Sequence, residues 1–161
     1  MKLDEEHPIG QPEKTFRVRI VWFTAQTAGD DALKSDEGLQ DVVEELSKVG
    51  AGTMSPLGQT IIQAVSGERF QISCLAPFVD GPAMVDIRGE LGSVQRTSHL
   101  KIDISAMRER SEGMEDKRGV RTRLVNLATE IIAPFGHFVV LGVTPAEERT
   151  LAFAVQVSPV E

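Results

Sequence analysis

Apolar and polar residues alternate with a period of two through most of this chain, and this alternation is the feature that most restricts its fold. In the clearest case, the segment TLAFAVQV, Leu151, Phe153, Val155 and Val157 fall on one face and the intervening residues on the other. That period is typical of a β-strand. The expected strands are residues 15–23, 59–65, 70–75, 85–91, 100–104, 124–132, 138–143 and 150–157.

Short turns join most of these segments, which favours antiparallel pairing, because a parallel connection needs a crossover of a dozen or more residues. Residues 66–68, Ser-Gly-Glu, are predicted to form a hairpin-like connection. Residues 133–137 are predicted to close a hairpin between segments 124–132 and 138–143. Pro134 is unsuited to an interior strand, and Gly136 tolerates backbone angles that other residues avoid.

A single amphipathic helix is expected at about residues 36–49. Its apolar stripe, spaced at three and four residues, is Leu39, Val42, Val43, Leu46 and Val49. Ser35 or Asp36 is suited to cap the start and Gly50 to end the helix. The predicted fold class is α+β, a predominantly antiparallel sheet or sandwich with this one main helix.

The length of 161 residues suits one domain, predicted as residues 15–161 behind a flexible N-terminal arm of residues 1–14. A net charge of −7 argues against a nucleic-acid partner, which would require a positive surface. The N-terminus does not resemble a signal peptide, and no segment is apolar over the roughly 18 residues that a membrane span needs. We therefore expect a cytoplasmic protein, or a cell-envelope or periplasmic one whose signal peptide has been removed.

The sequence contains no familiar catalytic, nucleotide-binding or zinc-binding motif, so we expect no enzyme activity, cofactor or metal site. The single Cys74 cannot form an internal disulfide, and its alternation with Phe70 and Ile72 predicts an inert thiol facing the core.

One polar strand face is the alternative candidate for ligand binding. Lys101 and Asp103 share one face of segment 100–104, and His99, which directly precedes the segment, lies on the same face. Turn residue His137 is a fourth candidate. The simpler interpretation is the solvent-facing side of a sheet. Arg121 and Arg123 alternate on a strand and are candidates for contact with an acidic partner. The charged segment in which they lie is otherwise expected to form a flexible hairpin tip.

Several of these segments, in this order, resemble the secretin domain of bacterial secretion and pilus channels. FRVRIVWFTA is similar to the opening strand of that family. VVEELSKVGAGTMSPLGQTIIQAVSGERFQI resembles its helix, linker and next two strands, and SHLKIDISAM its following strand. RLVNLATEIIAPFGHFVVLGV resembles the late hairpin, and LAFAVQVSP the closing strand.

The resemblance implies a non-enzymatic domain of a cell-envelope assembly, in which subunits extend one another's sheets into a ring. The chain departs from the family in two respects. Only seven residues separate Val143 from Leu151, where the family carries a longer segment, and no apolar lipid-facing band with aromatic girdles is apparent. We therefore expect a shortened, secretin-like domain that binds protein partners or copies of itself, without a transmembrane segment in this chain. The alternative is a monomeric small-ligand- or metal-binding module, or an unrecognised enzyme, that uses the polar face around His99.

Overall fold

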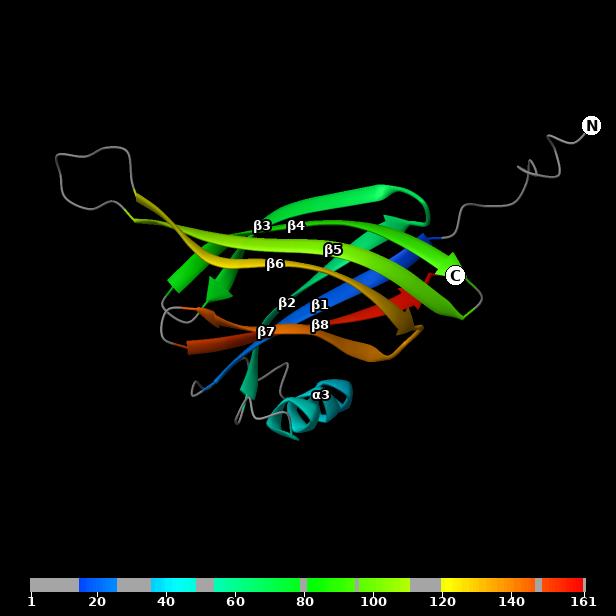
Figure 1. Cartoon of the computed structure of the whole chain (residues 1–161), viewed down its shortest axis with the longest axis horizontal. Helices are drawn as coiled ribbons and strands as arrows, with labels where there is room; N and C mark the ends of the chain where they lie inside the picture. Colours follow the sequence, from blue (N-terminus) through cyan, green and yellow to red (C-terminus); the bar gives the residue numbers. More distant parts are fainter. Residues whose placement is uncertain are drawn as a thin grey trace, which may run out of the picture.

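The computed structural model describes residues 15–25, 36–48, 54–78, 81–94, 96–110, 120–146 and 149–160. These residues form two stacked β-sheets with a helix below them, seen edge-on in Figure 1. The elements are β1 (Thr15–Ala25), α3 (Glu37–Lys48), β2 (Met54–Val65), β3 (Arg69–Phe78), β4 (Gly81–Val94), β5 (Thr97–Arg110), β6 (Val120–Pro134), β7 (Phe138–Ala146) and β8 (Arg149–Pro159). The predicted α+β, mostly antiparallel class is confirmed.

Each sheet has four strands in the described part of the chain. Sheet A has the order β2-β1-β8-β7, and sheet B the order β3-β4-β5-β6. All the pairs are antiparallel, as the short connections predict. The expected strands are all present, and most extend by several residues beyond the segments that the alternation marked.

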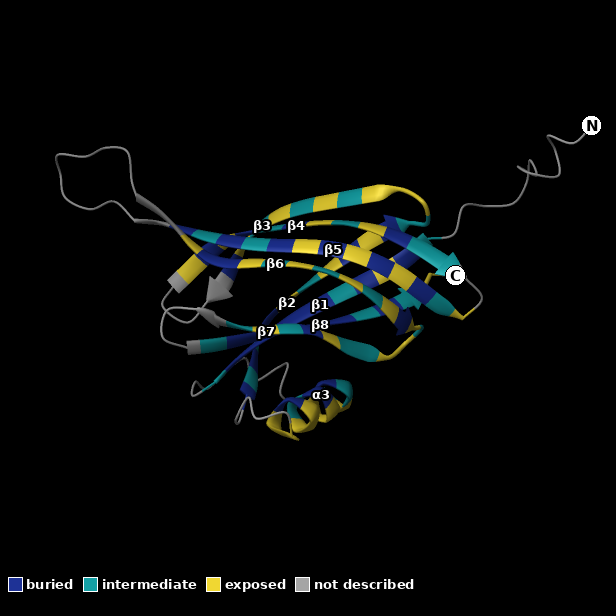
Figure 2. Ribbon diagram, in the orientation of Figure 1, coloured by how far each residue is buried: buried dark blue, intermediate teal, exposed yellow. Residues whose placement is uncertain are grey.

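The main core lies between the two sheets, where each contributes its apolar face. Phe16, Val18, Ile20 and Trp22 of β1 face the alternating apolar residues of β4 and β5, and Phe153 of β8 belongs to the same cluster. Figure 2 shows the resulting banding of buried and exposed residues along β5. Burial of this continuous apolar surface provides the principal driving force for stacking the sheets.

Helix α3 covers the opposite face of sheet A and creates a second core (Figures 1 and 2). Leu39, Val42 and Leu46 of its stripe are buried and pack with Val21 and Phe23 of β1. The predicted helix is thus confirmed, with Val43 half-buried. The remaining predictions for it, Ser35 as an alternative cap, Val49 in the stripe and Gly50 at the end, lie outside the described residues. So does the predicted arm of residues 1–14.

The two predicted hairpin connections are wrong in one respect: each carries the chain from one sheet to the other. Residues 66–68 lead from β2 of sheet A to β3 of sheet B, and residues 135–137 lead from β6 of sheet B to β7 of sheet A. The second turn is fixed to both layers, because the Phe135 amide donates to the Arg96 carbonyl and the Gly136 amide to the Val157 carbonyl. Gly67 and Gly136 have φ values of 86° and 82°, which glycine adopts without strain.

Candidate interaction surfaces

The sides of the sandwich are formed by edge strands. Sheet A ends in β2 and β7, and sheet B in β3 and β6. Because β2 continues into β3 and β6 into β7, each side consists of two consecutive strands joined by one short turn. The outer backbone groups of an edge strand are able to pair with another chain.

Most of the exposed large apolar side chains of the described residues lie on these edges. They are Ile61 on β2, Leu75 on β3, Ile132 on β6, and Val140 and Val143 on β7. Our sequence interpretation missed them as surface residues. The available signal was the pairs Ile61-Ile62 and Val139-Val140, where two consecutive apolar residues within a strand place apolar groups on both faces.

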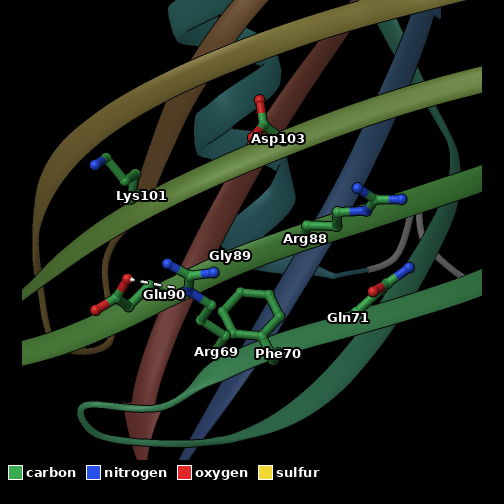
Figure 3. A pocket seen from close by; sticks show the side chains of 8 residues that line it. All are labelled: Arg69, Phe70, Gln71, Arg88, Gly89, Glu90, Lys101 and Asp103. Atoms are coloured by element: carbon green, nitrogen blue, oxygen red, sulfur yellow. Dashed lines mark ion pairs between the residues drawn. The ribbon is translucent and has the colours of Figure 1, made fainter.

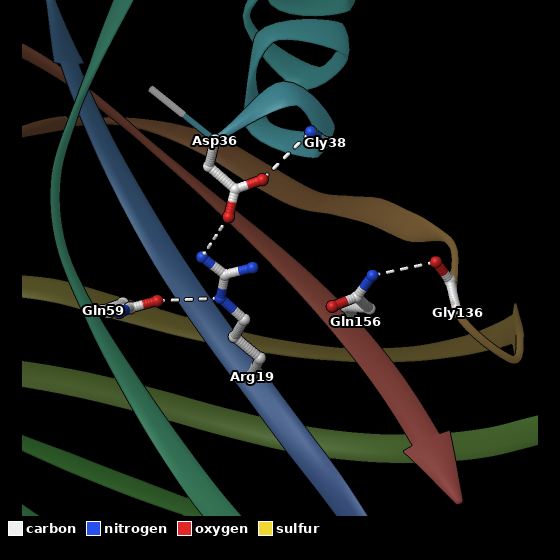
Figure 4. A network of polar contacts seen from close by, with 6 residues as sticks. All are labelled: Arg19, Asp36, Gly38, Gln59, Gly136 and Gln156. Carbon is white, nitrogen blue, oxygen red and sulfur yellow. Dashed lines mark hydrogen bonds and ion pairs between the residues drawn. The ribbon is translucent and has the colours of Figure 1, made fainter. Parts of the chain in front are cut away.

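Arg19 of β1 anchors the start of α3 to sheet A (Figure 4). Its guanidinium binds the Asp36 carboxylate at 2.8 Å, donates to the Gln59 side chain at 2.8 Å, and lies 5.4 Å from the centre of the Phe138 ring. Asp36 also caps the helix by accepting a hydrogen bond from the Gly38 amide. The hydrogen bond from Arg19 lowers the pKa of Asp36, which partial burial opposes. This cluster fixes α3 beside β7.

A hollow of about 240 Å³ lies between α3 and β7, and we refer to it as the α3–β7 hollow. Val42, Phe138 and Val140 supply its apolar surface, and Asp41 and Glu45 of α3 also line it. The predicted candidate His137 lies here too, exposed, next to the turn that joins β6 to β7.

A second hollow, of about 490 Å³, lies on the outer face of sheet B (Figure 3). Lys101 and Asp103 of the predicted polar face line it, together with Arg69, Arg88 and Glu90. Arg69 and Glu90 form a loose ion pair at 3.9 Å. The outer hollow therefore combines three cations with two carboxylates.

The four predicted ligand-binding residues do not form one site. His99 is exposed on β5 and lies 2.5 Å from a carboxylate oxygen of Glu130, outside the outer hollow that Lys101 and Asp103 line. His137 belongs to the α3–β7 hollow, on the side of sheet A that bears the helix. Within the described residues, no group of three His, Cys, Asp or Glu side chains is placed to hold a metal ion.

Cys74 faces the core between the sheets, as its alternation predicts, and is half-buried against it. Burial raises the pKa of its thiol, the nearby Asp86 charge adds to this effect, and a hydrogen bond with Thr60 opposes it. A raised pKa reduces the thiolate fraction, so the nucleophilicity of this thiol is low at neutral pH.

The arginine candidates lie on edge strand β6. Arg123 is exposed and pairs across the sheet with Met107 of β5, and Arg121 pairs with Glu109. The Arg121 side chain and the tip of this β5–β6 hairpin lie outside the described residues. Arg123 thus occupies a position accessible to a partner.

No helix in the described residues is long and apolar enough to cross a membrane.

These observations define an antiparallel two-sheet sandwich with one covering helix, and solved structures that include secretins have a similar fold. The fold is similar to the Klebsiella pneumoniae type II secretion outer membrane complex of PulD, PulS and the PulC HR domain, with a TM-score of 0.52 and 9% identity. It is also similar to the InvG secretin domain of the Salmonella SPI-1 injectisome, at 0.51 and 9%, and to the V. cholerae type IV competence pilus secretin PilQ, at 0.52 and 11%.

Each comparison covers 99% of this chain, but only 43%, 66% and 63% of the respective solved chains. The chain therefore spans about two-fifths to two-thirds of the length of these proteins. No family model and no curated protein matches the sequence. The similar solved structures nevertheless confirm that the resemblance seen in the order of the sequence segments reflects a shared, secretin-like fold.

Proposed function

We propose that this protein is a non-enzymatic structural domain of a cell-envelope assembly, and that its copies associate through their strand edges. The observation that carries the proposal is the pair of double edges: β2 with β3 on one side of the sandwich, and β6 with β7 on the other. A copy placed beside another extends both sheets at once. Exposed apolar residues along these edges add hydrophobic area to the contact.

The strand directions are compatible with such an addition. Each sheet has four strands that alternate in direction, so its first and last strands run in opposite directions. A neighbouring copy in the same orientation therefore presents β2 antiparallel to β7, and β3 antiparallel to β6. This contact joins two different surfaces, and successive head-to-tail contacts of this kind generate a ring if the rotation between copies closes.

The similar solved structures support a setting in the cell envelope, because they belong to an outer membrane complex, an injectisome and a pilus secretin. We propose the same setting, periplasmic if the chain is exported, with proteins as the partners. The acidic net charge and the mixed charges of the outer hollow give no support to a nucleic-acid partner.

The test is the mass of the purified protein across a concentration series, by light scattering and native mass spectrometry. We expect discrete multiples of the 17.6 kDa chain that grow with concentration. Val143→Lys, on edge strand β7, should shift the population toward monomer. Met84→Lys, on central strand β4, is the matched control, because the two side chains are 44% and 45% exposed. A monomer at every concentration, with or without these changes, would refute the proposal.

The outer hollow supports a second candidate function, binding of a small anion by a monomer. Arg69, Arg88 and Lys101 bring three positive side chains around one concave surface. Isothermal titration with inorganic phosphate should show binding that Lys101→Ala weakens and His137→Ala leaves unchanged. No detectable heat with the original protein, or equal binding by both variants, would exclude this use of the hollow.

A further inference from the structure

Ile61 is an apolar residue that edge strand β2 leaves in contact with water. Its side chain is 52% exposed, whereas its neighbour Ile62 is 7% exposed and belongs to the core between the sheets. Since successive side chains on a strand point to opposite faces, Ile61 lies on the face of sheet A that bears α3. Its cross-strand partner Arg19, which contacts the cap of α3, is on the same face.

The opposite edge of sheet A carries a complementary feature on that same face, the α3–β7 hollow. Val140 of β7 is 37% exposed and contributes to its surface. Phe138 and Val42 continue the apolar lining between the strand and the helix. An apolar side chain that entered this hollow would remove itself, Val140 and the exposed part of Phe138 from water.

The strand register places Ile61 and the α3–β7 hollow at the same position along the strand direction of sheet A. Reading across sheet A, Ile61 pairs with Arg19, Arg19 pairs with Gln156, and Gln156 pairs with Phe138. A copy added beside β7 without a shift therefore brings Ile61 next to Phe138, and a shift of two residues brings it next to Val140. A shift by an odd number would turn Ile61 to the other face, where the apolar residues of the main core lie.

We propose that Ile61 of one copy binds in the α3–β7 hollow of the next copy. The inference rests on the proposed self-association and specifies its contact on sheet A: the partner is a second copy, and helix α3 is part of the interface. Because Ile61 and the hollow lie on opposite edges, the contact is head-to-tail, and each copy donates one isoleucine and receives one.

Cross-linking tests this pairing. In a Cys74→Ala background, Ile61→Cys and Val140→Cys are placed in separate chains, mixed, and treated with a short bis-maleimide. We expect a covalent dimer from the mixture and only monomer from either chain alone, and we expect the double variant to give a ladder of higher multimers. Two matched controls should react little with Ile61→Cys. The first is Val143→Cys, which lies further along β7 and outside the lining of the hollow. The second is Ile132→Cys, which lies on sheet B.

Light scattering of the same samples before cross-linking separates the two proposals. Association without the specific product, or with equal yields from the control pairs, would overturn the Ile61 contact and leave edge-to-edge assembly intact. Self-reaction of Ile61→Cys alone would indicate a two-fold contact and would also overturn it. Absence of association would overturn both proposals.

Discussion

Replacing Leu46 with Ala tests whether α3 is a packed layer of the fold. Leu46 is 1% exposed and lies in the core between α3 and sheet A, with Val21 and Phe23 among its cluster. The change removes three carbon groups, at about 0.8 kcal/mol each for the loss of burial, or about 2.4 kcal/mol. The residual cavity raises the expected loss to about 2–5 kcal/mol. Domains of this size are stable by only about 5–15 kcal/mol, so the effect is readily measured.

Urea unfolding provides the assay, because Trp22 is the sole tryptophan and is 1% exposed in the core between the sheets. Its fluorescence reports on the sandwich, and circular dichroism at 222 nm includes the helix. Both midpoints should fall together if the helix layer and the sandwich unfold as one unit. Ser47→Ala, exposed on the same helix, should change stability by no more than about 0.5 kcal/mol. An equally small change for Leu46→Ala would refute the packing described here.

Three further predictions follow from local geometry. Gly136→Ala should destabilise the protein by about 1–2 kcal/mol in urea unfolding. The cost is conformational, because φ at this position is 82° and no neighbouring atom would contact the added methyl group. An unchanged stability would mean that the turn relaxes. Asp36→Asn should lower the free energy of unfolding at neutral pH, and this loss should shrink as the pH falls below about 4. The pKa of Asp36 is lower in the folded than in the unfolded protein, so the carboxylate stabilises the fold above the unfolded-state pKa, and this contribution is lost as Asp36 is protonated. A loss of stability that does not depend on pH would contradict this reasoning. In the native protein at pH 8, Cys74 should react with a thiol reagent far more slowly than a free thiol does. In the protein unfolded in urea, it should react at the rate of a free thiol. Fast reaction in the native state would contradict the raised pKa of Cys74.

Local structure was predictable from this sequence because burial imposes a period on it. In β8, Phe153 and Val155 face the main core, and the pattern of alternation in this strand is regular. Even the small residues of its other face have a structural reason, since Ala152 and Ala154 lie beneath α3. The stripe of α3 was equally legible, because three of its positions contact the sheet.

The pairing of strands was less predictable, because a turn sequence determines only local backbone angles. Gly136 at positive φ is compatible both with a hairpin and with a connection between sheets. What distinguishes them are contacts with distant residues, such as the bond from the Gly136 amide to Val157, which no local pattern reveals. For the same reason, His99 and His137 could be grouped in sequence although they lie on different layers of the protein.

The chain passes directly from β2 to β3 and from β6 to β7, so neither sheet has an edge that is independent of the other. In the proposed assembly, this gives each contact between copies the character of a bivalent interaction. Once one sheet has paired, the tether of a few turn residues holds the second pair of edges at a high effective concentration. Two copies then separate only when the contacts of both sheets are broken at the same time. This favours long-lived association even where the contact of each sheet alone is weak.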